Sequence, residues 1–92
     1  MNKETYEFFG CEVSFDEKKL RKLLASQLDN EYYIEAKKNL VAIVYDRTRD
    51  YRVRKDALNM IFKHLKNQGV VVYHNGGIST SQMLTIMKEV LN

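Results

Sequence analysis

The sequence predicts one small α+β domain, covering residues 1–92, in the ferredoxin-like order β-α-β-β-α-β with an extra C-terminal helix. Three observations lead to this fold class. The chain has 92 residues, enough for one domain and one thin core. Short apolar runs with strand-like composition alternate with amphipathic segments, and these segments follow helix-capping residues. Split β-α-β units of this kind close into a four-stranded antiparallel sheet with two helices on one face.

Residues 5–15 are predicted to form the first strand, because their apolar side chains alternate from Phe9 onward. The members of this apolar face are Phe9, Cys11, Val13 and Phe15. Ser14 is followed three residues later by Glu17, which is the pattern of a capping box at the start of a helix. The apolar stripe of that helix consists of Leu20, Leu23, Leu24 and Leu28. We expect the helix to end at Asp29-Asn30.

Residues 31–47 fit two different structures, and the fold depends on the choice. As a hairpin, residues 32–34 and 40–45 are strands and residues 36–39 form the turn. This reading is favoured, because the arms are rich in β-branched and aromatic residues and Asn39 suits a turn. As one helix, the segment would place on a common face Tyr33, Ala36, Leu40 and Ile43. The domain would then be mostly α with a two-stranded sheet.

The second half of the chain predicts helix, strand and helix. Asp50 is expected to cap a helix whose apolar side contains Val53, Ala57, Leu58, Ile61, Phe62 and Leu65. Gly69 can end it with a positive φ, and residues 70–73 form a buried strand. Ser79 or Thr80 should cap the last helix. Its broad apolar face contains Met83, Leu84, Ile86, Met87, Val90 and Leu91.

Cysteine usage and hydropathy indicate a cytoplasmic location without membrane attachment. The single cysteine cannot form an internal disulfide, which favours a reducing compartment. The first residues contain no charged leader before a long apolar run, so no signal peptide is expected. The longest uncharged apolar run, residues 40–45, is far shorter than the roughly 20 residues of a membrane span.

The positive charge of the chain is concentrated in one segment. The net charge is +3, whereas residues 47–66 hold seven Lys or Arg against two Asp, a net of +5. The cations at its start are Arg47, Arg49, Arg52, Arg54 and Lys55. They occupy a loop and the first helical turns, where guanidinium groups and the helix N-terminus can contact phosphate. Nucleic-acid binding through this segment is therefore an alternative function.

A catalytic role is considered for Asp46, with His74 at the end of another predicted strand as a general base. A single Asp from each of two subunits holds Mg²⁺ in some small nucleases. Residues 40–46, the basic helix after them, and residues 69–73 and 78–83 resemble the small ferredoxin-like CRISPR adaptation subunits. The resemblance covers just over half of the chain, and that family's final strand is missing here. It implies that Asp46 corresponds to the Asp after the family's first strand, and makes a metal-dependent nuclease a less favoured alternative.

The preferred function is a small non-catalytic protein-interaction module: an adaptor, inhibitor or regulator of the type that phages and mobile elements encode. No zinc or nucleotide-binding spacing occurs, so no cofactor or metal is expected. Aromatic residues and methionine are enriched in protein interfaces. The residues expected to contact a partner protein or a second copy of the chain are Tyr33, Tyr45, Tyr73, Met83 and Met87.

Overall fold

Four helices and two short strands make up the part of the chain that the structure, a computed structural model, describes: residues 14–72 and 76–92. In chain order they are β1 (Ser14–Phe15), α2 (Glu17–Ser26), α3 (Glu31–Tyr45), α4 (Tyr51–Asn67), β2 (Val71–Val72) and α5 (Thr80–Leu91). The domain is therefore mainly helical with a two-stranded antiparallel sheet. This confirms the alternative fold class and not the preferred one.

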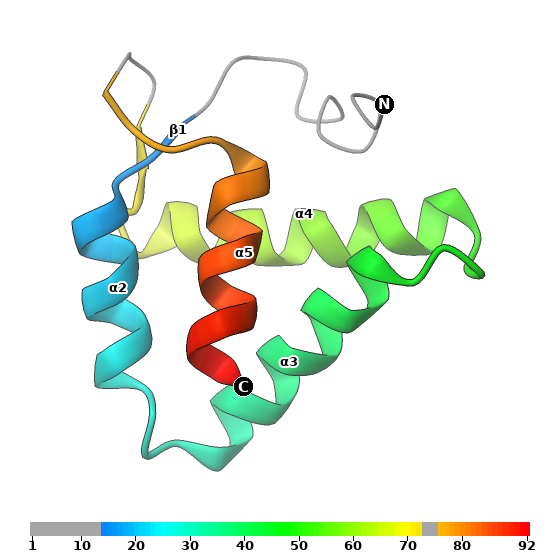
Figure 1. The fold of residues 1–92 in the computed structure, drawn as a ribbon, viewed down its shortest axis with the longest axis horizontal. Helices are drawn as coiled ribbons and strands as arrows, with labels where there is room; N and C mark the ends of the chain where they lie inside the picture. The colour runs from blue at the N-terminus through cyan, green and yellow to red at the C-terminus, as the bar shows by residue number, and fades with distance from the viewer. Residues whose placement is uncertain (1–13, 73–75) are drawn as a thin grey trace.

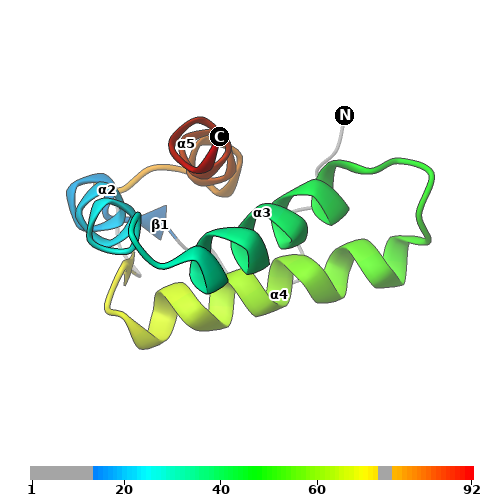
Figure 2. The ribbon, with the colours of Figure 1, turned by 90° about the horizontal axis from the view of Figure 1, so that it is seen from below.

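The helices pack in two layers. Helices α3 and α4 form an antiparallel pair, and this is the most extensive helix contact. Helix α5 lies between α2 and α3 and packs on both (Figure 1). Seen from below, α2 and α5 lie together on one side of the α3–α4 pair (Figure 2). None of the helices in residues 14–72 and 76–92 has the length and apolar character that a membrane span requires.

The predicted hairpin over residues 31–47 is wrong, because Glu31–Tyr45 is one continuous helix. The side chain of Asn30 accepts a hydrogen bond from the backbone N–H of Tyr33 at 3.0 Å and caps this helix. Val41 and Val44 are buried, so their packing in the core outweighs the weak strand preference of β-branched residues. The ferredoxin-like order of strands is therefore also wrong, because it requires the two strands of this hairpin. The resemblance to the CRISPR adaptation subunits fails too, because residues 40–45 are not a strand.

The first helix begins later and ends earlier than predicted. Its N-cap is Asp16, whose carboxylate accepts from the backbone N–H of Lys19 at 3.0 Å. Ser14 lies in β1 and is not the cap. The helix ends at Ser26, because Asn30 already begins the next helix. An Asp caps a helix as well as a Ser does, so the sequence pattern alone did not separate the two positions.

The signals for α4 and α5 are confirmed. The side chain of Asp50 caps α4 by accepting from the backbone N–H of Arg52 at 3.2 Å. Gly69 follows that helix with a φ of 75°. Ser79 and Gln82 form a reciprocal capping box at the start of α5.

The small sheet joins the start of the described chain to its C-terminal third. Ser14 pairs with Val72 and Phe15 with Val71 in antiparallel register. On its other side, Phe15 exchanges two backbone hydrogen bonds with Ile78, at 2.9 and 2.8 Å. Phe15 is therefore held from both sides. The rest of the strand predicted over residues 5–15, with Cys11, lies outside the described residues, as do Tyr73 and His74.

The core is formed by all four helices, β1 and the residue before β2. Its buried apolar side chains among the described residues are Phe15, Leu20, Leu24, Val41, Val44, Ala57, Leu58, Ile61, Leu65, Val70, Met83, Leu84, Ile86, Met87 and Leu91. The edge of the Phe15 ring meets Phe62 at a centroid distance of 6.4 Å. Helix α5 supplies many of these side chains, so the C-terminal helix is part of the core.

Candidate functional site

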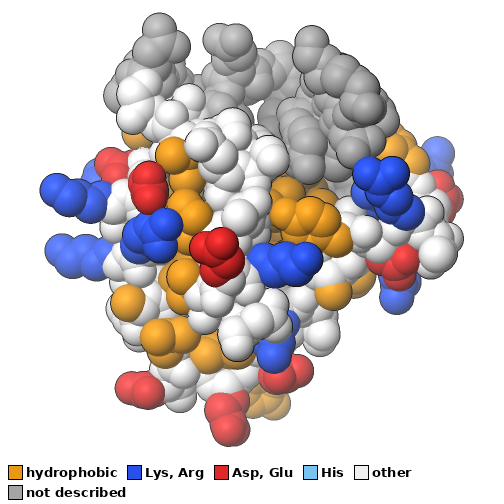
Figure 3. Space-filling view, viewed as in Figure 1, with side chains coloured by type: hydrophobic (Ala, Val, Ile, Leu, Met, Phe, Trp, Pro, Cys, Tyr) orange, Lys and Arg blue, Asp and Glu red, His pale blue; other side chains and the backbone are white. Residues whose placement is uncertain are grey.

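A groove of about 370 Å³ lies between the second halves of α3 and α5. Its side chains recur at intervals of three and four residues on each helix, which places them on one face of that helix. From α3 they are Lys38, Asn39, Val41, Ala42 and Tyr45, from α5 they are Met87, Lys88 and Leu91, and Asn92 follows α5. Apolar and basic side chains lie next to one another over α5 and α3 on the face seen in Figure 3.

The groove has an apolar floor and a basic rim. Val41, Met87 and Leu91 are buried and form its floor. Lys38 on α3 is half-buried, whereas Lys88 on α5 is exposed. The lining residues include no Asp, Glu, His or Cys side chain. The groove thus offers apolar surface, amide groups and two ammonium groups to an occupant.

Tyr45 and Lys88 connect the two sides of the groove. The Lys88 ammonium lies 4.8 Å from the centroid of the Tyr45 ring, within the range of a cation–π contact. Tyr45 is 39% exposed, so much of its side chain remains accessible in this position. This contact orients a cation and an aromatic ring at one end of the groove.

The five residues expected at a protein interface do not form one surface in the structure. Tyr45 and Met87 come together in the groove. Met83 and Met87 are both completely buried in the core, and of the two Met87 lines the groove while Met83 does not. Tyr33 is half-buried and packs against His64 of α4. Tyr73 lies outside the described residues.

Most of the groove was missed by the sequence interpretation. Reading residues 31–47 as a hairpin divided Lys38, Ala42 and Tyr45 between a turn and a strand. The signal in the sequence was the spacing of three and four residues that places these side chains on one helical face. This spacing indicates a common surface only if the segment is a helix.

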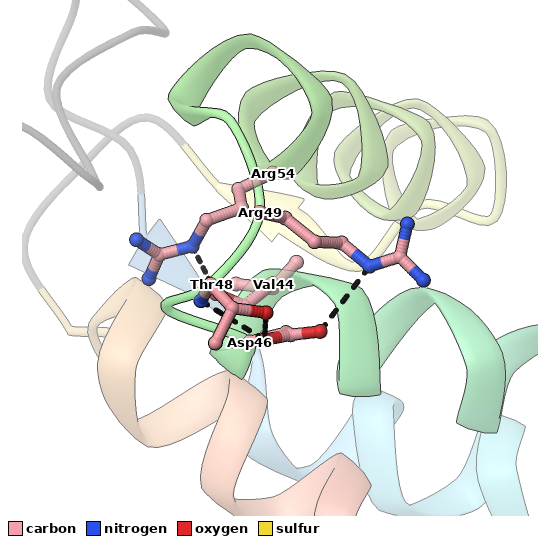
Figure 4. A network of polar contacts seen from close by, with 5 residues as sticks. All are labelled: Val44, Asp46, Thr48, Arg49 and Arg54. Carbon is pink, nitrogen blue, oxygen red and sulfur yellow. Dashed lines mark hydrogen bonds and ion pairs between the residues drawn. The ribbon is translucent and has the colours of Figure 1, made fainter.

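Two arginines of the basic segment, Arg49 and Arg54, contact the connection between α3 and α4. Arg49 forms an ion pair with Asp46, with 3.3 Å between Nε and the carboxylate oxygen (Figure 4). Arg54 donates from Nε to the backbone oxygen of Val44 at 3.0 Å, and so supplies a partner to a carbonyl in the last turn of α3. Arg47 and Lys55 also take part in contacts. Arg52 is exposed at the start of α4.

Asp46 is bound by its own loop. Its carboxylate accepts from the hydroxyl of Thr48 at 2.6 Å and from the backbone N–H of the same residue at 3.0 Å. These two hydrogen bonds, and then the charge of Arg49, lower the pKa of Asp46. Across residues 14–72 and 76–92, no three His, Cys, Asp or Glu side chains are grouped so that they could hold a metal ion.

A second polar cluster lies where the start of α3 meets the end of α4. The rings of Tyr33 and His64 are 5.4 Å apart, and the Lys37 ammonium is 5.0 Å from the Tyr33 ring centroid. The Tyr33 hydroxyl and His64 Nε2 are both buried and have no hydrogen-bond partner among the described residues. Burial lowers the pKa of His64, and the charge of Lys37 lowers it further. Burial also raises the pKa of Tyr33 and lowers that of Lys37.

We expect this cluster to make the fold less stable as the pH falls below about 6.5, the pKa of an unperturbed imidazole. The pKa of His64 is lower in the folded chain, so the unfolded chain binds more protons in this range. The stability contributed by neutral His64 is therefore complete above about pH 6.5 and decreases as the pH falls toward the folded pKa. Urea unfolding at about pH 8 and about pH 5 would measure the change.

The control uses His64→Leu, which removes the titrating imidazole. Both proteins should carry His74→Gln, so that the only other histidine of the sequence is absent. The difference in stability between the two pH values should shrink in the His64→Leu variant. An equal pH dependence in both proteins would contradict the role given to His64. Asp46 does not interfere, because its pKa is lowered from 3.8 and lies below this pH range.

Comparison with protein-family models, with curated proteins and with solved structures finds no match for this chain.

Proposed function

We propose that this chain is a small, non-catalytic, cytoplasmic interaction module that binds a partner protein in the groove between α3 and α5. The observation that carries this proposal is the apolar floor of the groove, bordered by an exposed tyrosine and two lysines. Buried apolar pockets with a polar rim and an aromatic anchor are typical of protein-binding surfaces. An adaptor, an inhibitor or a regulator would use such a surface.

The chemistry of the groove favours binding over catalysis. General acid–base catalysis most often uses an imidazole or a carboxylate, and less often Lys, Tyr or Cys, and the lining residues include no imidazole or carboxylate. The lining side chains are apolar, amide, phenol and ammonium groups. They are suited to contacting a protein surface, where an apolar side chain enters the floor and polar groups bind the rim.

The contacts of the basic segment favour a protein partner over nucleic acid. Arg49 is paired with a carboxylate, and Arg54 donates to a backbone carbonyl inside the domain. A phosphate group would have to compete with these contacts, which lowers the gain from binding. Because Arg49 and Arg54 make these contacts within the domain, their positions have an explanation that requires no nucleic acid.

A pair of matched variants on α3 tests the proposal. Ala42 lines the groove, whereas Ala36 lies on the same helix outside it, and both are exposed. We expect Ala42→Trp to place an indole in the groove and to weaken partner binding at least about tenfold. Ala36→Trp should leave binding within about twofold. Surface substitutions of this kind change stability by only about 0.5 kcal/mol, so both variants should fold.

The partner would first be isolated from the native host with the unmodified chain and identified by mass spectrometry. Calorimetric titration of the purified partner with the two variants would then measure the affinities. Equal binding by Ala42→Trp and the unmodified chain would show that the groove is not the binding surface. Equal loss in both variants would place the surface elsewhere on α3.

A further inference from the structure

We infer that the groove between α3 and α5 selects a short acidic segment of its partner, with one or two large apolar side chains between carboxylates. This inference rests on the proposed function and specifies the chemistry of the partner. It follows from three features of the groove: its size, its charge and the positions of its two lysines.

The size of the groove sets the length of the bound segment. Lys38 precedes Tyr45 by two helical turns, about 10 Å along α3. The groove has a volume of about 370 Å³ and an apolar floor. A groove of these dimensions accepts one or two apolar side chains and not a whole amphipathic helix face. The occupant is therefore a short segment of a partner.

The charge of the groove sets the sign of the occupant. Lys38 and Lys88 are the charged side chains among the lining residues. The C-terminal end of α5 contributes a partial negative charge of about half a unit, smaller than the charge of two ammonium groups. The amide of Asn92 also donates to the carbonyl of Lys88 at 2.8 Å, which satisfies one carbonyl at that end. The side-chain charge of the groove is therefore complementary to carboxylates.

The positions of the lysines set the spacing of the carboxylates. The Lys88 ammonium is held above the Tyr45 ring at one end of the groove, at 4.8 Å from its centroid. The backbone of Lys38 lies about 10 Å from that of Tyr45 along α3, toward the other end of the groove. Because a lysine side chain reaches several ångström from its backbone, carboxylates spaced on the order of 10 Å can meet both cations while the apolar side chains between them enter the floor. Charged groups at an interface rim fix register and specificity in this manner.

Three synthetic peptides that differ only in charge test the inference. The acidic peptide carries two leucines between glutamates that lie about 10 Å apart in an extended segment. In the neutral peptide glutamine replaces each glutamate, and in the basic peptide lysine does. Titration of the full chain, followed by amide chemical shifts, reports both affinity and location. We expect the acidic peptide to shift the amides of Ala42, Tyr45 and Leu91, with an affinity about tenfold higher than the neutral peptide.

Charge variants of the chain provide the matched control. Lys38→Glu combined with Lys88→Glu should abolish binding of the acidic peptide and create binding of the basic one. Lys63→Glu, on the exposed surface of α4 outside the groove, should change neither. Raising the salt concentration from about 50 to about 300 mM should weaken binding of the acidic peptide more than binding of the neutral peptide, because salt screens the charges at the rim of the groove.

Each other outcome overturns the inference. Equal binding of acidic and neutral peptides would show that the lysines do not select the occupant, although a groove that binds apolar segments would remain. Shifts of the same amides on dilution of the chain alone would identify a second copy as the occupant. A change in the shifts of these amides when Phe8→Ala and Phe9→Ala are introduced together would identify the first residues of the chain as the occupant of the groove. Absence of peptide binding, with partner binding still lost in Ala42→Trp, would refute the acidic segment and leave the proposed function standing.

Discussion

Replacing Phe15 by alanine is expected to lower the free energy of unfolding by about 3–5 kcal/mol. The Phe15 side chain is completely buried, and the edge of its ring meets Phe62. Alanine would leave a cavity at the point where β1 contacts α5 and β2. A domain of this size has a total stability of only about 5–14 kcal/mol, so the variant should be partly unfolded near physiological temperature. Urea unfolding followed by circular dichroism would measure the loss.

Two further variants separate the cavity from other effects. Met60 is 59% exposed, and Met60→Ala should change stability by less than about 0.5 kcal/mol. Phe15→Leu keeps most of the buried volume and should cost less than about 1.5 kcal/mol. If Phe15→Ala costs no more than Phe15→Leu, the ring is not a central element of the core.

How far the sequence predicts this fold depends on which signal governs each segment. The cap Asp50 and the terminating Gly69 act locally, so residue type and position were sufficient to find them, and the same signals narrowed the cap of α5 to Ser79 or Thr80. Residues 31–45 carry conflicting signals. Their β-branched residues favour a strand, while their spacing permits a helix, and burial of Val41 and Val44 against other helices decides the outcome. That tertiary contact is absent from any local pattern.

The candidate site could be predicted only in part for the same reason. Tyr45 and Met87 were selected because of their residue types, and these two do lie in the groove. Met83 was selected on the same grounds but does not line the groove, since residue type alone does not distinguish the two sides of a helix that packs on both neighbours. The pairing of Lys88 with Tyr45 joins residues that are far apart in sequence. Such a contact becomes visible only when the packing of α5 on α3 is known.

A second large effect is expected at Gly77, where alanine should lower stability by about 3 kcal/mol, near the upper end of overpacking costs. A Cβ added there would lie 2.6 Å from the backbone oxygen and 2.9 Å from the backbone nitrogen of Phe15. Both distances are far below van der Waals contact, and backbone atoms cannot rotate away. Strand β1 would therefore have to move, which would strain the two hydrogen bonds between Phe15 and Ile78. Urea unfolding would give the cost, and hydrogen exchange at the amides of these two residues would show where the structure opens.

Gly69 provides the matched comparison, because the two glycines are required for different reasons. Gly69 has a φ of 75°, while a Cβ there would meet nothing within 4 Å. Gly69→Ala should cost roughly 1–2 kcal/mol, the strain of a left-handed backbone at a residue with a Cβ, and should leave the Phe15 amide protected. Gly77→Ala should cost more and expose that amide to exchange, because the added atom meets β1 itself. Equal losses in the two variants, with the Phe15 amide protected in both, would mean that β1 and the turn before α5 can separate without cost to the fold.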